Sequence, residues 1–535
     1  MNMKKNEPYN QIRHFADFRD MLCTNAKEFA AEPAFQYESA GKRTEITYSK
    51  FWDDVCAFGA YLCSLGLEKA KVGLVGNNCY EWIVTYFATV ISAEMIFPLD
   101  KELGDPELLT LIKAGQCNVL VYSKGKKSIL PQAEELGVEH FLCMDEFEDI
   151  LEAGKALIES GDKRFFECNA SLDDVCAVIY TSGTTGNPKG VMLSQRNLMS
   201  DAIHSLENLS IPKGTVLLLP LNHTFGFMAG VLCQLWVGFP VYLNDSLKTV
   251  LKSIQAAKPG HLSVVPLYIK SFYKNIWSNV EKQGKTKQLK ALIKASNAMR
   301  KAGIDMRKTF FKPVLKAFGG NLEMLITGGA PIDDFYMKAF DDFGIKIING
   351  YGITECSPIV STNRACWIKS GSVGLPIPGM HARIDEPNEN GEGEVCIKGD
   401  IVMKGYYENQ EATDAVLIDG WFHTGDIGKI DEDGFLYITG RKKNMILTGN
   451  GKNVYPEELE NLLEQVENVT EVVVYSEDDV ITAEIYTEAG ADAHEQIKKD
   501  VMELNKDIAG YKQIRKIKFR KEEFVKTSTK KIKRG

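Results

Sequence analysis

The amino-acid sequence predicts an α/β protein. A large N-terminal domain of mostly parallel sheets, flanked by helices, would be followed by a small C-terminal α+β domain. Three observations lead to this prediction. The chain has 535 residues, which is too many for one ordinary hydrophobic core. From about Phe15 to Leu436, helical patterns alternate with short β-branched runs, as is typical of parallel sheets. After Gly440 both the composition and the pattern change.

The strands expected in the large domain are short apolar runs between helical patterns. We expect strands at residues 71–75, 97–99, 119–122, 175–180, 216–219, 262–265, 324–327 and 346–348. Residues 270–317 are predicted to be a long, basic helical segment.

The small domain is expected to begin with an amphipathic helix at residues 456–466. This segment has Pro456 in its first turn, acidic residues near its start, and apolar residues at helical spacing. Further elements are expected as strands at 471–475 and 481–486, a helix at 495–509 and a strand at 514–519. We therefore place the domains at residues 1–440 and 441–535, joined by a linker near Lys443.

Composition excludes several classes of protein. With 44% hydrophobic and 25% charged residues, the chain resembles soluble globular proteins, and its net charge of −9 argues against general nucleic-acid binding. The twelve cysteines include no Cys-x-x-Cys pair, which favours free thiols in a reducing cytoplasm. The N-terminus lacks the apolar core of a signal peptide, and no run of about 20 apolar residues predicts a transmembrane segment.

One internal segment is strongly basic. Residues 281–316 hold eleven lysines and arginines against two acids. Such a segment can be a solvated helical face, or a surface that attracts an acidic coenzyme or an anionic membrane. Both interpretations remain open, so peripheral membrane contact is a possible property of the chain.

The residues from Tyr180 to Gly190, Tyr-Thr-Ser-Gly-Thr-Thr-Gly-Asn-Pro-Lys-Gly, predict a phosphate site. Glycines allow backbone N–H groups to close on an anion, hydroxyls add donors, and Lys189 adds a positive charge. The pattern differs from the common phosphate loop, in which the lysine directly follows the second glycine and precedes a serine or threonine. A simple nucleotide hydrolase is therefore a weaker interpretation.

This loop resembles the signature of the adenylate-forming superfamily, which includes acyl-coenzyme A synthetases, the adenylation domains of peptide synthetases, and luciferases. Five further segments match the superfamily pattern in the expected order. They are 327–331 (Thr-Gly-Gly-Ala-Pro), 349–355 (Asn-Gly-Tyr-Gly-Ile-Thr-Glu), 420–426 (Gly-Trp-Phe-His-Thr-Gly-Asp), 440–443 (Gly-Arg-Lys-Lys) and 526–534 (Lys-Thr-Ser-Thr-Lys-Lys-Ile-Lys-Arg).

The resemblance implies a set of nucleotide-binding residues. Tyr351 would stack on adenine, Asp426 and Arg441 would hold the ribose, and Thr354 would touch the α-phosphate. The full implied set for ATP and AMP is Thr181, Ser182, Gly183, Thr184, Thr185, Gly186, Lys189, Gly329, Ala330, Asn349, Gly350, Tyr351, Gly352, Thr354, Asp426 and Arg441.

The resemblance also implies catalytic and metal-binding residues. Mg²⁺ would be bound by Thr181 and Glu355, in keeping with the preference of this cation for oxygen ligands. The catalytic residues would be Lys531, Glu355, Thr354 and Lys189. Lys530 stands where the superfamily often has glycine, so the neighbouring lysine remains an alternative to Lys531.

Other positions are expected around the acyl group and the thiol substrate. His223, Phe225 and Gly328 would line an acyl pocket, although a lone histidine is more often a packed structural residue. Lys443 occupies the hinge position of the superfamily, about which the small domain would move. Gly451 lies in the loop that would approach coenzyme A.

The function that the resemblance implies is ATP-dependent activation of a carboxylic acid. An acyl adenylate and pyrophosphate would form first, and transfer to coenzyme A would then give a thioester and AMP. The apolar stretch 225–232 and the long basic segment favour a fatty acid, most like the substrates of long-chain acyl-coenzyme A synthetases. The alternatives are transfer to an acyl carrier protein, adenylation of another acid, and an adenylate-binding scaffold that has lost catalysis.

Overall fold

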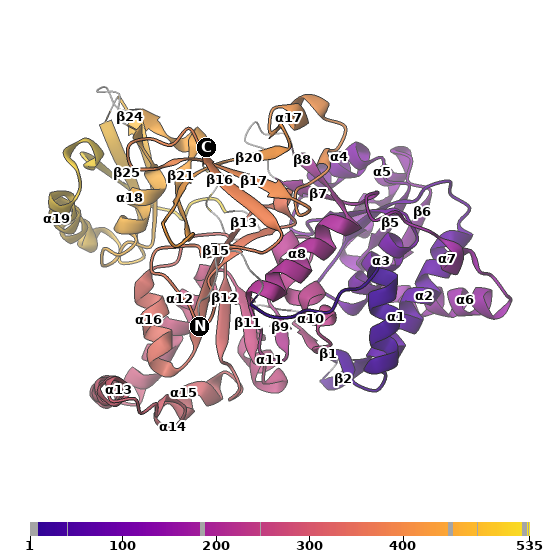
Figure 1. The fold of residues 1–535 in the computed structure, drawn as a ribbon, viewed down its shortest axis with the longest axis horizontal. Coiled ribbons are helices and arrows are strands. Elements are labelled where there is room, and N and C mark those ends of the chain that lie inside the picture. The colour runs from indigo at the N-terminus through magenta and orange to yellow at the C-terminus, as the bar shows by residue number, and fades with distance from the viewer. Residues whose placement is uncertain are drawn as a thin grey trace.

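The computed structural model describes residues 9–39, 41–181, 188–244, 246, 248–447, 453–478, 480–526, 532 and 534. It confirms the predicted fold class: a large N-terminal α/β part carries a smaller C-terminal α+β part at one end (Figure 1). Several sheets make up the large part, and helices cover them.

The first sheet has seven strands in the order β18-β8-β7-β4-β3-β5-β6. The five strands from β7 to β6 are parallel, and β8 and β18 are added in antiparallel pairing. The strands are β3 (Lys71–Val75), β4 (Met95–Leu99), β5 (Val119–Tyr122), β6 (His140–Cys143), β7 (Val175–Thr181), β8 (Lys189–Ser194) and β18 (Gly405–Tyr406). Because β4 and β5 are wholly buried, they appear in the sequence as continuous apolar runs, and β3 does so after its first residue, Lys71.

Two more sheets contain parallel strands. One has the order β11-β12-β13-β14-β15, with β11 to β13 parallel, and the other has the order β2-β1-β10-β9. Their strands are β1 (Pro33–Ser39), β2 (Lys42–Thr47), β9 (Thr215–Leu217), β10 (Val241–Leu243), β11 (His261–Val264), β12 (Met324–Thr327), β13 (Lys346–Gly352), β14 (Ile359–Thr362) and β15 (Leu375–Pro376).

Residues 380–441 form an antiparallel sheet that the sequence interpretation did not anticipate. Its order is β16-β17-β20-β19, with β21 paired to β20. The strands are β16 (Met380–Asp385), β17 (Gly393–Gly399), β19 (Leu417–Ile418), β20 (Trp421–Ile430) and β21 (Leu436–Arg441). This sheet lies between the parallel sheets and the C-terminal part (Figure 1).

Helices of the large part surround the sheets. They are α1 (Phe18–Glu28), α2 (Tyr48–Ser64), α3 (Tyr80–Ile91), α4 (Asp105–Gly115), α5 (Leu130–Glu135), α6 (Phe147–Glu159), α7 (Arg164–Glu167), α8 (Gln195–Asn208), α9 (Thr224–Phe227), α10 (Cys233–Trp236), α11 (Val250–Ala257), α12 (Pro266–Lys282), α13 (Thr286–Lys301), α14 (Arg307–Phe310), α15 (Lys312–Ala317), α16 (Asp334–Phe343) and α17 (Gln410–Asp414). In the described part of the chain, no helix is both long and apolar enough to cross a membrane.

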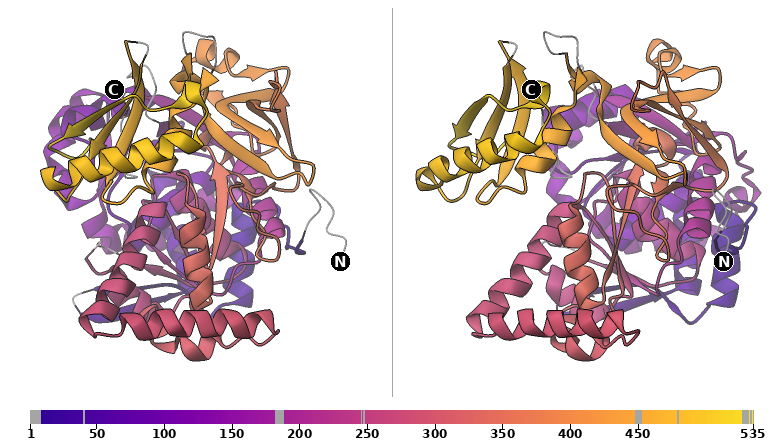
Figure 2. Two further views of the ribbon diagram at one scale, coloured as in Figure 1. Left: turned by 90° about the vertical axis from the view of Figure 1, so that its left-hand side faces the viewer. Right: turned by 60° about the vertical axis from the view of Figure 1, so that its left-hand side comes forward.

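The C-terminal part has its own hydrophobic cluster, built from helix and strand residues such as Leu459, Val474, Ile485 and Ile497. Its elements are β22 (Ile446–Leu447), β23 (Asn453–Val454), α18 (Pro456–Leu463), β24 (Glu471–Glu477), β25 (Val480–Tyr486), α19 (His494–Leu504) and β26 (Lys516–Arg520). Figure 2 shows this part on one side of the large part, away from α13 to α15.

Some predicted boundaries were wrong. The strand predicted at 216–219 ends at Leu217, and the helix predicted at 495–509 ends at Leu504. Strand β13 runs to Gly352, four residues beyond its predicted end, because Gly350 and Gly352 pair with β14 in the antiparallel direction. Tyr351, the residue that the resemblance implies would stack on adenine, therefore lies on a strand that pairs in parallel at its start and antiparallel at its end.

Candidate active site

A large cavity, about 2910 Å³ in volume, opens between the large part and the C-terminal part. It brings together every candidate site residue that the structure describes. These are Thr181, Lys189, His223, Phe225, Gly328, Gly329, Ala330, Asn349, Gly350, Tyr351, Gly352, Thr354, Glu355, Asp426, Arg441 and Lys443. The remaining candidates lie outside the described residues: Ser182, Gly183, Thr184, Thr185, Gly186, Gly451 and Lys531, with its neighbour Lys530.

The two ends of the predicted phosphate loop lie side by side. Thr181 ends β7 and Lys189 begins β8, and these two residues are partners across the antiparallel pair. The Lys189 ammonium lies 4.8 Å from the centre of the Tyr406 ring, a cation–π arrangement that orients the lysine. Both Thr181 and Lys189 line the cavity.

Glu355 is a buried carboxylate on the cavity wall, with 8% of its surface exposed. The Tyr406 hydroxyl donates a hydrogen bond to it at 2.9 Å. Burial raises the pKa of Glu355, and the Tyr406 hydrogen bond opposes that rise. A divalent cation would stabilise this desolvated charge. The donor set of Glu355 with the Thr181 hydroxyl therefore fits Mg²⁺, which prefers oxygen ligands and keeps several waters.

Asp426 joins two residues for which the sequence implied separate roles. Its side chain lies on β20 opposite Arg441 of β21, and the Arg441 Nε lies 2.7 Å from its Oδ1. The Tyr351 hydroxyl of β13 donates to the Oδ2 of the same carboxylate. Burial and the Asp426 charge both raise the pKa of Tyr351. The predicted adenine and ribose residues thus form one hydrogen-bonded group on a buried acid.

Glycines allow close backbone approach on this wall. A Cβ at Gly352 would lie 2.2 Å from the carbonyl oxygen of Pro358, which no side chain tolerates. Gly329 has a φ of +80°, in the left-handed region that favours glycine. Both glycines are therefore required by the backbone itself.

Two of the predicted acyl-pocket residues, His223 and Phe225, lie at the start of α9, and the third, Gly328, directly follows β12. His223 precedes this helix, and Phe225 packs against an apolar cluster that includes Leu209 and Ile326. All of these residues line the cavity. Two further lining residues, Gln234 and His261, were not predicted, because nothing in the local sequence around either one indicates a pocket.

The C-terminal part contributes charged residues to the cavity. Arg534 forms ion pairs with Glu460 and, at 3.5 Å, with Glu457 of α18. Burial raises the pKa of Glu460 to about 7, against the opposing effect of Arg534. Lys443 lies in a short 3₁₀ turn after β21, where burial and the nearby Arg441 lower its pKa. The part of the chain around the expected hinge is thus charged and partly buried.

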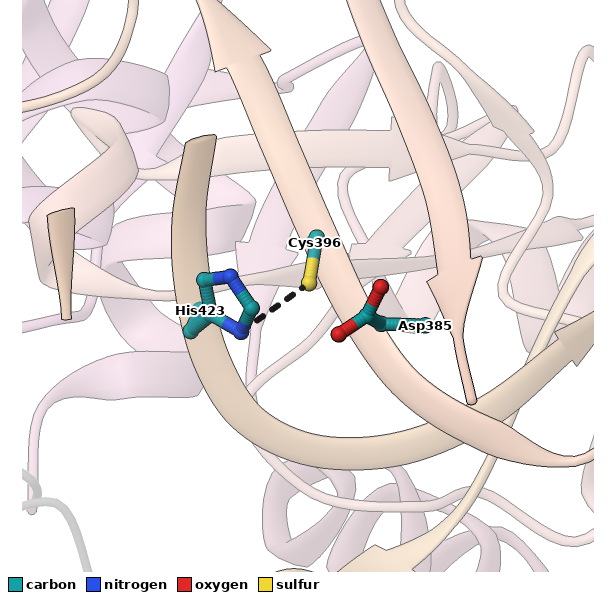
Figure 3. A group of neighbouring side chains, drawn as sticks. All are labelled: Asp385, Cys396 and His423. Carbon is teal, nitrogen blue, oxygen red and sulfur yellow. Dashed lines mark hydrogen bonds between the residues drawn. The ribbon is translucent and has the colours of Figure 1, made fainter. Parts of the chain in front are cut away.

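A neighbouring group on the antiparallel sheet contains Asp385, Cys396 and His423 (Figure 3). Their donor atoms all lie within 4.8 Å of one another, and the Cys396 Sγ is 3.4 Å from the His423 Nδ1. Burial raises the pKa of the Cys396 thiol to about 11, and Arg383 lies 3.4 Å from Asp385. Cys396 is buried, whereas Asp385 and His423 are partly exposed and each has a charged neighbour, Arg383 and Glu394 respectively.

Comparison with known proteins supports the resemblance to adenylate-forming enzymes independently of the cavity geometry. The family model described as AMP-binding enzyme matches residues 22–407. The chain is 30% identical over 480 residues to long-chain-fatty-acid–CoA ligase 6 of Mus musculus, covering 82% of this chain and 67% of that protein. It is 29% identical over 469 residues to long-chain-fatty-acid–CoA ligase FadD15 of Mycobacterium tuberculosis, covering 81% and 76%.

Solved structures share the fold over nearly the whole chain. The anthranilate CoA ligase AuaEII, in complex with anthranoyl-AMP, has a TM-score of 0.79 at 22% identity, covering 97% of this chain and 96% of that one. A fatty acyl CoA synthetase of Mycobacterium tuberculosis has a TM-score of 0.68 at 22% identity, covering 96% of each chain.

Proposed function

The chain belongs to the AMP-binding enzyme family, and we propose that the acid it activates is a fatty acid. It is an AMP-forming acid–thiol ligase. ATP and the acid give an acyl adenylate and pyrophosphate, and coenzyme A then takes the acyl group and releases AMP. The observation that best supports the substrate assignment is the apolar wall of the cavity at Phe225, Leu209 and Ile326.

The chemistry explains what the site must do. A carboxylate is a poor acyl donor, because its leaving group would be oxide. When its oxygen attacks the α-phosphate of ATP, the P–O bond to pyrophosphate breaks and the carboxylate gains a good leaving group, AMP. Catalysis then consists mainly of placing the carboxylate in line with that bond and stabilising charge on the phosphates.

We assign roles in this reaction to residues of the cavity. Lys189 neutralises charge on the β- and γ-phosphates at the mouth of the loop, and Thr354 donates to the α-phosphate. Asp426 accepts hydrogen bonds from the ribose hydroxyls, held in place by Arg441. When bound, Mg²⁺ supplies positive charge to the phosphate oxygens, and Glu355 with Thr181 would hold it.

The C-terminal part would supply the second set of groups. We infer that Lys531 approaches the α-phosphate and the carboxylate during adenylation. The domain of residues 441–535 would then turn about Lys443 relative to residues 1–440, which removes Lys531 and brings Gly451 toward coenzyme A. No covalent enzyme intermediate is required, because the thiol attacks the acyl adenylate directly.

The experiment that tests this function is ATP–pyrophosphate exchange across a panel of carboxylic acids. We expect exchange with fatty acids, and thioester and AMP only when coenzyme A is added. Glu355→Gln should lose at least about 100-fold in exchange rate, as expected for removal of a charge-stabilising group. Glu323→Gln, at an exposed acid paired with Lys308, is the matched control. Absence of exchange with every acid would refute the proposal.

The acceptor is a separate question from the acid. An acyl carrier protein is the alternative to coenzyme A, and it would also deliver a thiol to the cavity. Supplying the purified enzyme with each acceptor in turn distinguishes the two. Thioester on a carrier protein but none on coenzyme A would overturn our assignment of the acceptor.

We propose that the basic helices α12 to α15 can bring the enzyme to an anionic membrane from the cytoplasm. Exposed lysines for which the structure gives no ion pair are Lys282, Lys285, Lys287, Lys290, Lys294, Lys301, Lys312 and Lys316. Ile304, in the same region, is 51% exposed. Helices α13 to α15 lie at one edge of the molecule, away from the C-terminal part (Figure 2), whereas α12 pairs with that part through Lys270 and Glu464. A charged surface of this kind attracts anionic lipid, about 1 kcal/mol per lysine.

Sedimentation with lipid vesicles tests this membrane contact. Binding is expected to anionic vesicles and to be lost with zwitterionic ones, and with the combined Lys287→Gln, Lys290→Gln and Lys294→Gln substitutions. Equal sedimentation of the substituted and unchanged proteins would remove the proposal. Exchange activity measured in parallel shows whether the substituted protein is folded.

A further inference from the structure

The antiparallel sheet that carries Asp426 brings three different metal-binding side chains together. Cys396 of β17 and His423 of β20 are partners across one antiparallel pair. Asp385 of β16 is the partner of Glu394, which lies two positions before Cys396 on β17. Side chains two positions apart on a strand, and side chains of paired residues, share a face of the sheet. A thiol, an imidazole and a carboxylate from three strands therefore converge at one point (Figure 3).

The distances within this group fit a tetrahedral zinc ion. Zinc lies about 2.3 Å from a sulfur ligand and about 2.0–2.1 Å from an imidazole nitrogen, so at a tetrahedral angle these two ligand atoms are about 3.6 Å apart. The Cys396 Sγ and the His423 Nδ1 are 3.4 Å apart. The donor atom of Asp385 lies within 4.8 Å of both, and its side chain, 36% exposed, has room to rotate toward them. Three protein ligands and one water complete such a site.

A second carboxylate adds negative charge beside this point. The Glu394 Oε2 lies 3.5 Å from the His423 Nδ1. The backbone N–H of Gly425 donates to the other oxygen of Glu394 at 2.9 Å, and the Lys442 ammonium donates to Oε2 at 2.8 Å. Glu394 is therefore held in place by partners of its own. It favours a cation at this point without having to bind it directly.

The positive neighbour of the group has another contact to keep. The Arg383 Nη2 lies 3.4 Å from the Asp385 Oδ1. Its guanidinium carbon also lies 4.5 Å from the centre of the Trp421 ring, in a cation–π arrangement. When Asp385 turns toward a metal ion, Arg383 can stay on the indole. The arginine therefore competes with a metal for Asp385 but does not block the site.

An ion can reach the group from solvent. Cys396 is fully buried, whereas His423 and Glu394 line the large cavity and Asp385 is partly exposed. The sulfur thus lies at the inner end of the group, and the oxygen and nitrogen ligands lie at its outer end. Cys396 is a free cysteine, so its sulfur is available to a metal.

We propose that Asp385, Cys396 and His423 form a zinc site that ties β16, β17 and β20 together. A thiolate with an imidazole and a carboxylate is a donor set typical of zinc, whereas Mg²⁺ takes oxygen ligands. On binding, the Zn–S bond replaces the S–H bond of Cys396, and the thiol proton passes to solvent. The site lies on the strand that carries Asp426. It is separate from the expected Mg²⁺ ligands Thr181 and Glu355, and it does not depend on the acid that the enzyme activates.

Titration of the full-length protein with Co²⁺ tests this site. The protein is first freed of metal with a chelator, and the buffer contains Mg²⁺ but no nucleotide. A cobalt–thiolate bond gives a charge-transfer absorption band, which oxygen ligands alone do not produce. We expect one equivalent of Co²⁺ to develop this band in the unchanged protein, and Zn²⁺ to remove it by displacing the cobalt. Absence of the band at saturating Co²⁺ would overturn the proposal without any variant.

Variants identify the ligands. Cys396→Ser should lose the band, and its zinc affinity, measured by competition with a chromophoric indicator, should fall at least about 100-fold. Asp385→Asn, at a partly exposed position, should keep the band and bind zinc about 10-fold more weakly. Cys23→Ser, which removes a thiol on α1, is the matched control and should change neither quantity. A band and an affinity that survive Cys396→Ser would place the metal elsewhere and refute our assignment.

Thermal unfolding supplies a readout that does not depend on the cobalt spectrum. A metal that binds only the folded chain raises the midpoint of unfolding. Added Zn²⁺ should therefore raise the midpoint of the unchanged protein and of Cys23→Ser, and leave that of Cys396→Ser unaltered. The same scans without zinc show whether each variant is folded. Equal shifts in the unchanged protein and in Cys396→Ser would contradict the proposal.

Discussion

Replacing Asp426 by asparagine tests the hydrogen-bonded group at the centre of the cavity. This carboxylate is 2% exposed, accepts from the Tyr351 hydroxyl, and lies 2.7 Å from the Arg441 Nε. Asparagine keeps the shape but removes the charge, and its amide nitrogen can no longer accept. At least one partner of this carboxylate, which is Tyr351, Arg441 or the ribose, then loses its hydrogen-bond acceptor.

The size of the effect follows from these contacts. Hydrogen bonds to charged groups contribute about 1.5–3 kcal/mol each, and the substitution weakens at least one of them and leaves another buried donor unpaired. A loss of about 3 kcal/mol corresponds to about 100-fold in kcat/KM for ATP. The control is Asp431→Asn, an acid at the far end of β20 and β21 that pairs with Lys369 and does not line the cavity.

The assay is pyrophosphate exchange at saturating fatty acid with ATP varied. We expect Asp426→Asn to fall by about 100-fold and Asp431→Asn to stay within threefold of the unchanged enzyme. If Asp426→Asn also stays within threefold while remaining folded, the carboxylate does not hold the ribose, and the assignment of this group is wrong.

Three further predictions concern charge and packing. Burial lowers the pKa of His261 to about 4, whereas the unfolded chain takes up this proton near pH 6.5. Stability should therefore be lost as pH falls between these values, by up to about 3 kcal/mol, and urea unfolding of His261→Gln should show less of this loss. A Cβ at Gly154 would lie 1.9 Å from the Ala57 carbonyl oxygen of α2, so Gly154→Ala should lower the free energy of unfolding in urea by about 3 kcal/mol. The control Gly125→Ala, at a position with open space around it, should leave that free energy unchanged. Because Arg534 pairs with Glu460, Arg534→Gln should slow pyrophosphate exchange about 10-fold and leave the rate of acyl transfer from supplied acyl adenylate unchanged. An equal loss of rate in both steps would contradict this prediction.

Much of the fold could be predicted from the sequence, because its central strands are buried on both faces. Strands such as β3, β5 and β12 appear as mostly apolar runs, and their predicted bounds match the observed ones. The antiparallel sheet of residues 380–441 could not be predicted in this way. Its strands owe their pairing to partners elsewhere in the chain, as where β17 pairs with β20, and no local pattern specifies that register.

In the candidate site, too, local motifs could be predicted from the sequence, whereas contacts between distant parts of the chain could not. Asp426 and Glu355 were predicted from motifs, and the structure places both on the cavity wall. Tyr406, which donates to Glu355, comes from a two-residue strand that exists only through pairing with β8. The contact of Gln234 with His261 joins residues that are 27 positions apart in the sequence. Such pairs arise from tertiary packing, and no spacing rule reveals them.

The central claim is that a carboxylate oxygen attacks the α-phosphate of ATP. The most direct measurement uses a fatty acid labelled with ¹⁸O in both carboxylate oxygens, with ATP and coenzyme A, and mass spectrometry of the products. One labelled oxygen should appear in AMP, and the thioester should keep the other. Label in pyrophosphate or inorganic phosphate, or AMP free of label, would contradict the account.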